Sequence, residues 1–140
     1  MWRDEHFVLA DPSALTSRLR QESWLLFVNA SETHAPYLAP PELVMLQRRN
    51  SLYRNGKGII PGGTPFAKVM SSLHEAQIGA LELLDKRLKI LFSHLPTPFD
   101  FLICADHGEA FGEDGLWGHV HSHRAVLDIP MWAGTYGESG

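Results

Sequence analysis

Residues able to bind a metal ion or an anion gather in one short stretch, 103–119. Asp106 and His107 are adjacent there, and His119 follows later in the same stretch. The residues around and between them include four glycines: Gly108, Gly112, Gly115 and Gly118. Glycine permits tight turns, so we expect His119 to fold back toward Asp106. A carboxylate beside an imidazole, with another imidazole returning from a loop, is a donor set suited to a divalent metal ion or an anion.

Two apolar runs are positioned to deliver these side chains. Residues 99–104 carry one charge, Asp100, and residues 24–29 are apolar almost throughout, a pattern typical of buried parallel strands. The first run leads directly to Asp106 and His107, and the second leads into a polar loop that contains His34. Open α/β sheets bind ligands at the carboxyl ends of their strands. We therefore expect both histidine-bearing loops to open at one edge of a single sheet.

The remaining patterns predict an α/β fold with a mainly parallel sheet flanked by helices. Asp11 and Pro12 form a helix start, and residues 66–95 carry apolar residues at helical spacing until Pro96. Residues 125–134 read as a final strand, in which Pro130 indicates an edge or a bulge. Residues 47–65 are polar and rich in glycine and proline. They are interpreted as an irregular insertion within a single domain spanning residues 1–140.

Composition narrows the classes of partner. The chain has 140 residues and a formal net charge of −4, with no long basic run, which argues against nucleic acid. No stretch approaches the ~20 apolar residues that a membrane span requires. The first residues are charged and lack the apolar region of a signal peptide, so a cytoplasmic location is expected. The single cysteine, Cys104, lies in an apolar run and is expected to be buried and inert.

The motifs together resemble the sulfatase branch of the alkaline phosphatase superfamily. Residues 105–109 (Ala-Asp-His-Gly-Glu) and 115–119 (Gly-Leu-Trp-Gly-His) resemble the late metal-binding segment of that family. Residues 33–37 (Thr-His-Ala-Pro-Tyr) resemble the loop that follows an earlier strand, and residues 127–132 resemble the strand after the metal-binding segment. The resemblance covers most of the chain in the family's order and implies a partial alkaline phosphatase/sulfatase-like fold.

The resemblance also implies roles for four residues. Asp106 and His107 match the pair that ligates the catalytic divalent metal, which leaves calcium, magnesium, manganese and zinc open. His34 matches a histidine that contacts the sulfate or phosphate group. His119 falls where sulfatases usually have lysine and is more like the phosphoethanolamine transferases and phosphate-ester hydrolases, so the choice between sulfate and phosphate stays open. From donor chemistry alone, adding His119 or His121 to the pair gives a three-ligand zinc-type site.

One part of the family pattern is absent from the sequence. No acidic metal ligands followed by a nucleophile at a helix start precede His34, so the chain resembles the C-terminal half of the catalytic domain. It is expected to be inactive alone. Two hypotheses follow. In the first, an N-terminal-half polypeptide completes a hydrolase of sulfate or phosphate esters. In the second, the chain is a truncated paralogue that acts as a metal-binding or protein-interaction module and self-associates.

Overall fold

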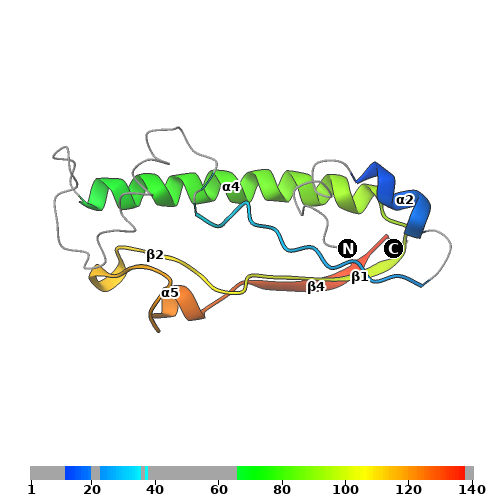
Figure 1. The fold of residues 1–140 in the computed structure, drawn as a ribbon. Coiled ribbons are helices and arrows are strands. Elements are labelled where there is room, and N and C mark those ends of the chain that lie inside the picture. Colours follow the sequence, from blue (N-terminus) through cyan, green and yellow to red (C-terminus); the bar gives the residue numbers. More distant parts are fainter. Residues whose placement is uncertain (1–11, 20–22, 36, 38–65, 138–140) are drawn as a thin grey trace.

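The structure is a computed structural model. Its longest element is the helix α4 (Phe66–His94), along which the other described elements lie (Figure 1). The structure describes residues 12–19, 23–35, 37 and 66–137. Val69, Leu73, Ala80 and Leu91 lie on the buried side of α4 at helical spacing. The helix ends before Pro96, whose ring cannot continue the pattern of backbone hydrogen bonds. The helix predicted from the periodicity of residues 66–95 is confirmed.

The C-terminal half of α4 packs on strand β1 (Phe99–Cys104) and helix α2 (Ser13–Leu19). Leu91, Leu95 and Phe99 form the buried centre of this core. The ring of Phe92 meets the ring of Phe99 edge-on at a centroid distance of 5.1 Å. The hydroxyl of Thr16 donates to the carbonyl of His94 over 2.7 Å, which ties α2 to the end of α4.

The sheets are small and antiparallel, so the prediction of a mainly parallel sheet is wrong. β1 pairs with β4 (Met131–Tyr136) antiparallel, and β2 (Ala110–Phe111) pairs with β3 (Trp117–Gly118) antiparallel. After β1 the chain turns back on itself, through the β2–β3 hairpin and the one-turn helix α5 (Arg124–Leu127). That helix takes the first part of the stretch predicted as a final strand, because the His123 side chain caps it by accepting from the Ala125 N–H.

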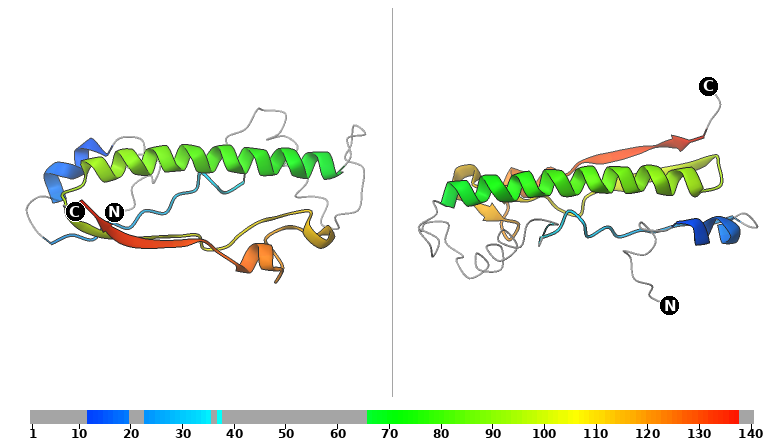
Figure 2. Two further views of the ribbon diagram at one scale, coloured as in Figure 1. Left: turned by 180° about the vertical axis from the view of Figure 1, so that it is seen from behind. Right: turned by 90° about the horizontal axis from the view of Figure 1, so that it is seen from above.

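Residues 23–30 are extended but make no backbone hydrogen bond to any described element. Their side chains alternate: Trp24 and the next even-numbered residues face the core shared with α4 and β1, and the odd-numbered residues face away. Leu25 and Phe27 are 93% and 87% exposed. The segment lies alongside β1 beneath α4 in two views, but without pairing to β1 it adds no parallel strand to the sheet (Figures 1 and 2).

The side of β1 that faces away from α4 is apolar and open. Phe99 and Phe101 point into the core, so alternation places Leu102 and Cys104 on the opposite side. Met131 lies across from Cys104 in the antiparallel register and shares that side. Leu102 is 64% exposed and Met131 68%. Cys104 is also exposed, which corrects the expectation that it is buried.

The N-terminal half of α4 has its own core. Val69, Met70 and Leu73 pack with Tyr37, and Phe111 of the β2–β3 hairpin packs against the edge of this cluster. The hairpin thereby lies against the helix end opposite to β1 and β4 (Figure 1). The insertion predicted at residues 47–65 lies outside the described residues. Within the part of the chain that the structure describes, no helix has the length and apolarity to cross a membrane.

Candidate metal centre

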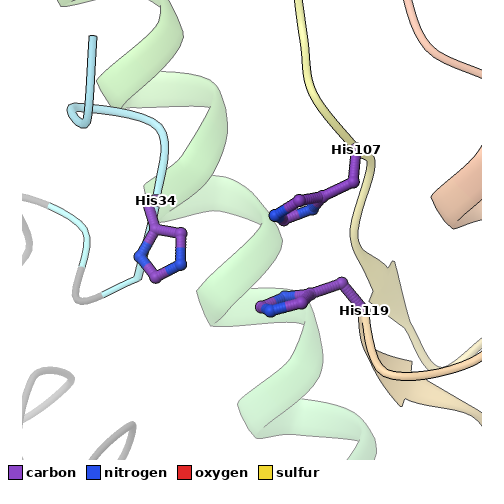
Figure 3. Close-up of side chains that lie close together, drawn as sticks. All are labelled: His34, His107 and His119. Atoms are coloured by element: carbon purple, nitrogen blue, oxygen red, sulfur yellow. The ribbon is translucent and has the colours of Figure 1, made fainter. Parts of the chain in front are cut away.

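Three imidazoles from two distant segments meet beside α4 (Figure 3). His34, His107 and His119 each offer one nitrogen, and these atoms all lie within 4.8 Å of one another. The rings of His107 and His119 stack with centroids 4.2 Å apart. The His34 ring approaches from the other side, with its centroid 5.8 Å from that of His119 and 6.4 Å from that of His107.

The register of the β2–β3 hairpin explains why His107 and His119 meet. Ala110 pairs with Gly118, so one step further out Glu109 lies opposite His119. Gly118 has a φ of +79°, a backbone conformation that glycine adopts without strain just before His119. Gly108 fixes the other side, where its N–H donates to the carbonyl of Val126 over 2.8 Å. A Cβ atom at Gly108 would lie 2.1 Å from the Ala125 carbonyl oxygen, so only glycine permits this approach.

Hydrogen bonds fix the same tautomer in all three rings. Nδ1 of His34 donates to the Ala35 carbonyl over 2.6 Å, and Nδ1 of His107 donates to the Gly108 carbonyl over 2.9 Å. Nδ1 of His119 lies 2.8 Å from Oε2 of Glu109. A carbonyl or carboxylate oxygen only accepts, so Nδ1 carries the proton in each ring. In the neutral ring with this tautomer Nε2 has the lone pair through which histidine binds a metal ion.

His34 reaches the group from a loop attached to α4 by side chains. The His34 N–H closes a turn on the carbonyl of Ser31 over 3.1 Å. Within the turn, Glu32 pairs with Arg87, and after it the Tyr37 hydroxyl accepts from Gln77 over 3.4 Å. Burial raises the pKa of Tyr37 well above its ordinary value, and the negative charge of Glu109 adds to this shift.

Asp106, predicted as a metal ligand, does not join the three-histidine group. Its side chain is 92% exposed, and its Oδ2 lies 4.0 Å from Nε2 of His107. Its Oδ1 accepts from the His107 N–H over 3.0 Å. Asp106 is therefore an exposed carboxylate beside His107. Its role as a ligand stays a prediction, as do the substrate-contact roles of His34 and His119.

The other histidines of the loop serve elsewhere. Nε2 of His123 lies 3.2 Å from Oδ2 of Asp114, while its Nδ1 caps α5. Nδ1 of His121 accepts from the His123 N–H over 3.4 Å. His121, weighed from the sequence as an alternative third ligand, is therefore not the histidine that meets His107. β3 ends at Gly118, so residues 119–123 do not continue it as a strand.

Acidic and basic side chains around the group were not foreseen from the sequence. The sequence patterns assign no role to Glu109. The register of the β2–β3 hairpin places it opposite His119. Glu32 and Arg87 are 55 positions apart, and no local pattern relates them.

The donor set fits some metal ions better than others. Three neutral imidazoles suit zinc and the neighbouring transition metals, whereas calcium and magnesium require mainly oxygen ligands. The fit is supported by the partly buried position of the ring atoms: the side chains of His107 and His119 are 32% and 35% exposed.

Comparison with protein-family models, curated proteins and solved structures found no match to this chain.

Proposed function

We propose that this protein binds a zinc-class divalent ion through His34, His107 and His119 and is the metal-binding part of a hydrolase of sulfate or phosphate esters. The observation that carries the proposal is the convergence of three imidazoles with Nδ1 of each ring already engaged by an oxygen. A histidine that donates through Nδ1 presents its free nitrogen in a fixed direction. Of the ions left open by the sequence, zinc suits this nitrogen-rich set best.

The chemistry follows from the number of ligands. A zinc ion bound by the three histidines would supply Lewis-acid chemistry, which polarises an ester oxygen or activates water near neutral pH. Glu109 accepts a hydrogen bond from Nδ1 of His119 and so holds the orientation of that ring. The proposal gives Asp106, an exposed carboxylate beside His107, the role of adding an oxygen ligand or orienting a polar group of the substrate.

Ester hydrolysis also needs groups that the described residues do not bring to the three histidines. We propose that a second polypeptide, or a second copy of this chain, covers the open apolar side of residues 23–30, β1 and β4. The exposure of Leu25, Phe27, Leu102 and Met131 supports this part of the proposal. Large apolar side chains gathered on one face typically mark an interaction surface.

The first test is zinc binding by the purified protein. We expect about one zinc per chain at neutral pH by competition with a chromophoric chelator, and a strong loss of affinity in His107→Ala. His94→Ala is the matched control, because His94 is a histidine at the far end of α4. Absence of stoichiometric zinc in the wild type would refute the metal site and the hydrolase together.

The second test is catalysis. Zinc-loaded protein is assayed on an aryl sulfate and an aryl phosphate, alone and with candidate partners that co-purify with it. Cleavage that is lost in His107→Ala supports the hydrolase. Zinc binding without cleavage of either ester in any combination would instead favour the non-catalytic metal-binding module.

A further inference from the structure

Glu32 is a buried charge with one counter-ion. Its side chain is 2% exposed, and its Oε1 lies 2.6 Å from Arg87 NH1 on α4. Its Oε2 is buried and has no hydrogen-bond partner among the described residues. A carboxylate withdrawn from water is strongly unfavourable unless a cation compensates it. Arg87 therefore determines where Glu32 can lie.

The position of Glu32 matters because His34 is two residues away. The preceding segment, residues 23–30, has no backbone hydrogen bond to the described elements and is held by the packing of its side chains. Two polar side-chain contacts join this loop to α4 in the described part of the chain: the Glu32–Arg87 pair and the Tyr37–Gln77 pair. These two contacts flank His34 in the sequence.

We propose that Arg87, through Glu32, is a positioning residue for His34 as a metal ligand. The inference rests on the proposed metal centre and adds a requirement to it. The His34 imidazole is brought to His107 and His119 by the ion pair between Glu32 of the loop and Arg87 of α4. Without Arg87 the carboxylate of Glu32 moves toward water, and the turn that carries His34 moves with it. The centre then has two imidazoles in place of three.

A double-mutant cycle on zinc affinity tests this coupling. Zinc affinity is measured for wild type, Arg87→Met, His34→Ala and the double variant. We expect Arg87→Met to weaken zinc binding about tenfold, as loss of an outer positioning group does in metal sites. In the His34→Ala background the same substitution is expected to change zinc affinity by less than about twofold, because Arg87 acts on the metal only through His34. If Arg87 and His34 acted independently, their effects would add and the loss would be about tenfold in both backgrounds.

Two further measurements make the test specific. Arg124→Met is the matched control: the Arg124 and Asp128 side chains pair at an exposed position (88% and 61% exposed), so loss of this pair is expected to leave zinc affinity unchanged. Visible absorption of the cobalt-substituted protein reports the ligand set directly, and we expect Arg87→Met to resemble His34→Ala in its spectrum. Should Arg87→Met prove unfolded by circular dichroism, Arg87→Lys, which keeps the charge, is expected to show a smaller loss in the same cycle.

The outcomes separate the positioning role from the metal site. Equal losses in the two backgrounds, or unchanged affinity and cobalt spectrum in folded Arg87→Met and Arg87→Lys, would overturn the positioning role while the metal site stands. A wild-type protein that binds no zinc would overturn the proposed function first.

Discussion

Nδ1 of His119 lies 2.8 Å from Oε2 of Glu109, directly across the β2–β3 hairpin. The Glu109 side chain is only 17% exposed, so its charge is poorly screened by water and acts on the ring it contacts. A carboxylate in this position makes the opposite ring nitrogen a stronger electron donor. The hairpin register thus places the Glu109 carboxylate where it would strengthen His119 as a metal ligand.

Glu109→Gln is expected to weaken zinc binding about tenfold with little change in fold, since the amide can still accept from Nδ1 but carries no charge. The measurement is zinc competition at neutral pH. Glu82→Gln, an exposed position on α4, serves as the control and is expected to bind zinc like the wild type. Equal affinities for Glu109→Gln and wild type would show that the carboxylate charge does not act on the centre.

Two glycine-to-alanine substitutions are expected to have opposite effects on stability. Gly108→Ala places a Cβ 2.1 Å from the Ala125 carbonyl oxygen, a backbone atom, and should lower the free energy of unfolding by about 2 kcal/mol. Gly79→Ala, within α4, meets nothing within 4 Å and should raise it by about 1 kcal/mol. Urea unfolding measures both. A stable Gly108→Ala would show that the loop of His107 does not need this approach to α5.

Alkaline pH is expected to destabilise the fold through Tyr37. Because burial raises the pKa of Tyr37 above its ordinary value of 10.0, the folded state holds the phenol proton more tightly than the unfolded state. The contribution is fully present below pH 10 and is lost as pH rises beyond that value. Thermal melts from pH 8 to 11 should therefore show a steeper fall in Tm for wild type than for Tyr37→Phe. Parallel curves would mean that another group causes the alkaline loss.

The apolar side of residues 23–30 and β1 predicts self-association of the isolated protein. Phe27→Ser is expected to shift wild-type oligomers toward monomer in sedimentation velocity, since Phe27 is 87% exposed. Ile78→Ser, on α4 at 48% exposure, is the control and should not change the distribution. A wild-type protein that is strictly monomeric at high concentration would contradict association through this surface.

Sequence patterns predict the elements of this fold better than their pairing. The periodicity of α4 and the apolar run of β1 are local, and both elements form as expected. Nothing local indicates that β1 pairs with a strand that returns antiparallel, or that residues 23–30 remain unpaired. The direction of β4 depends on the path that the β2–β3 hairpin and α5 give to the chain after β1. The same limit applies to Cys104, whose apolar neighbours suggest burial although no described element covers its side of β1.

The candidate site shows the same division. Histidines placed after apolar runs were expected to gather at one place, and His34 does lie against His107 and His119. The sequence could not separate Asp106, which is exposed, from the imidazoles that converge. Nor could it show that His34 depends on Arg87, because that contact joins a loop to a helix face far along the chain. Such contacts depend on the packing of whole elements rather than on spacing.

The separation of His34 from His107 along the chain has a consequence for folding. A metal ion bound by both would close a loop of 73 residues (107 − 34), in the manner of a cross-link. A permanent cross-link around a loop of that length reduces the entropy of the unfolded chain and thereby raises its free energy by roughly 4 kcal/mol at 25 °C. His34, where this loop begins, follows residues 23–30, whose backbone makes no hydrogen bond to a described element. Metal binding would thus tie residues 23–30, which join neither of the two described sheets, to the loop that carries His107.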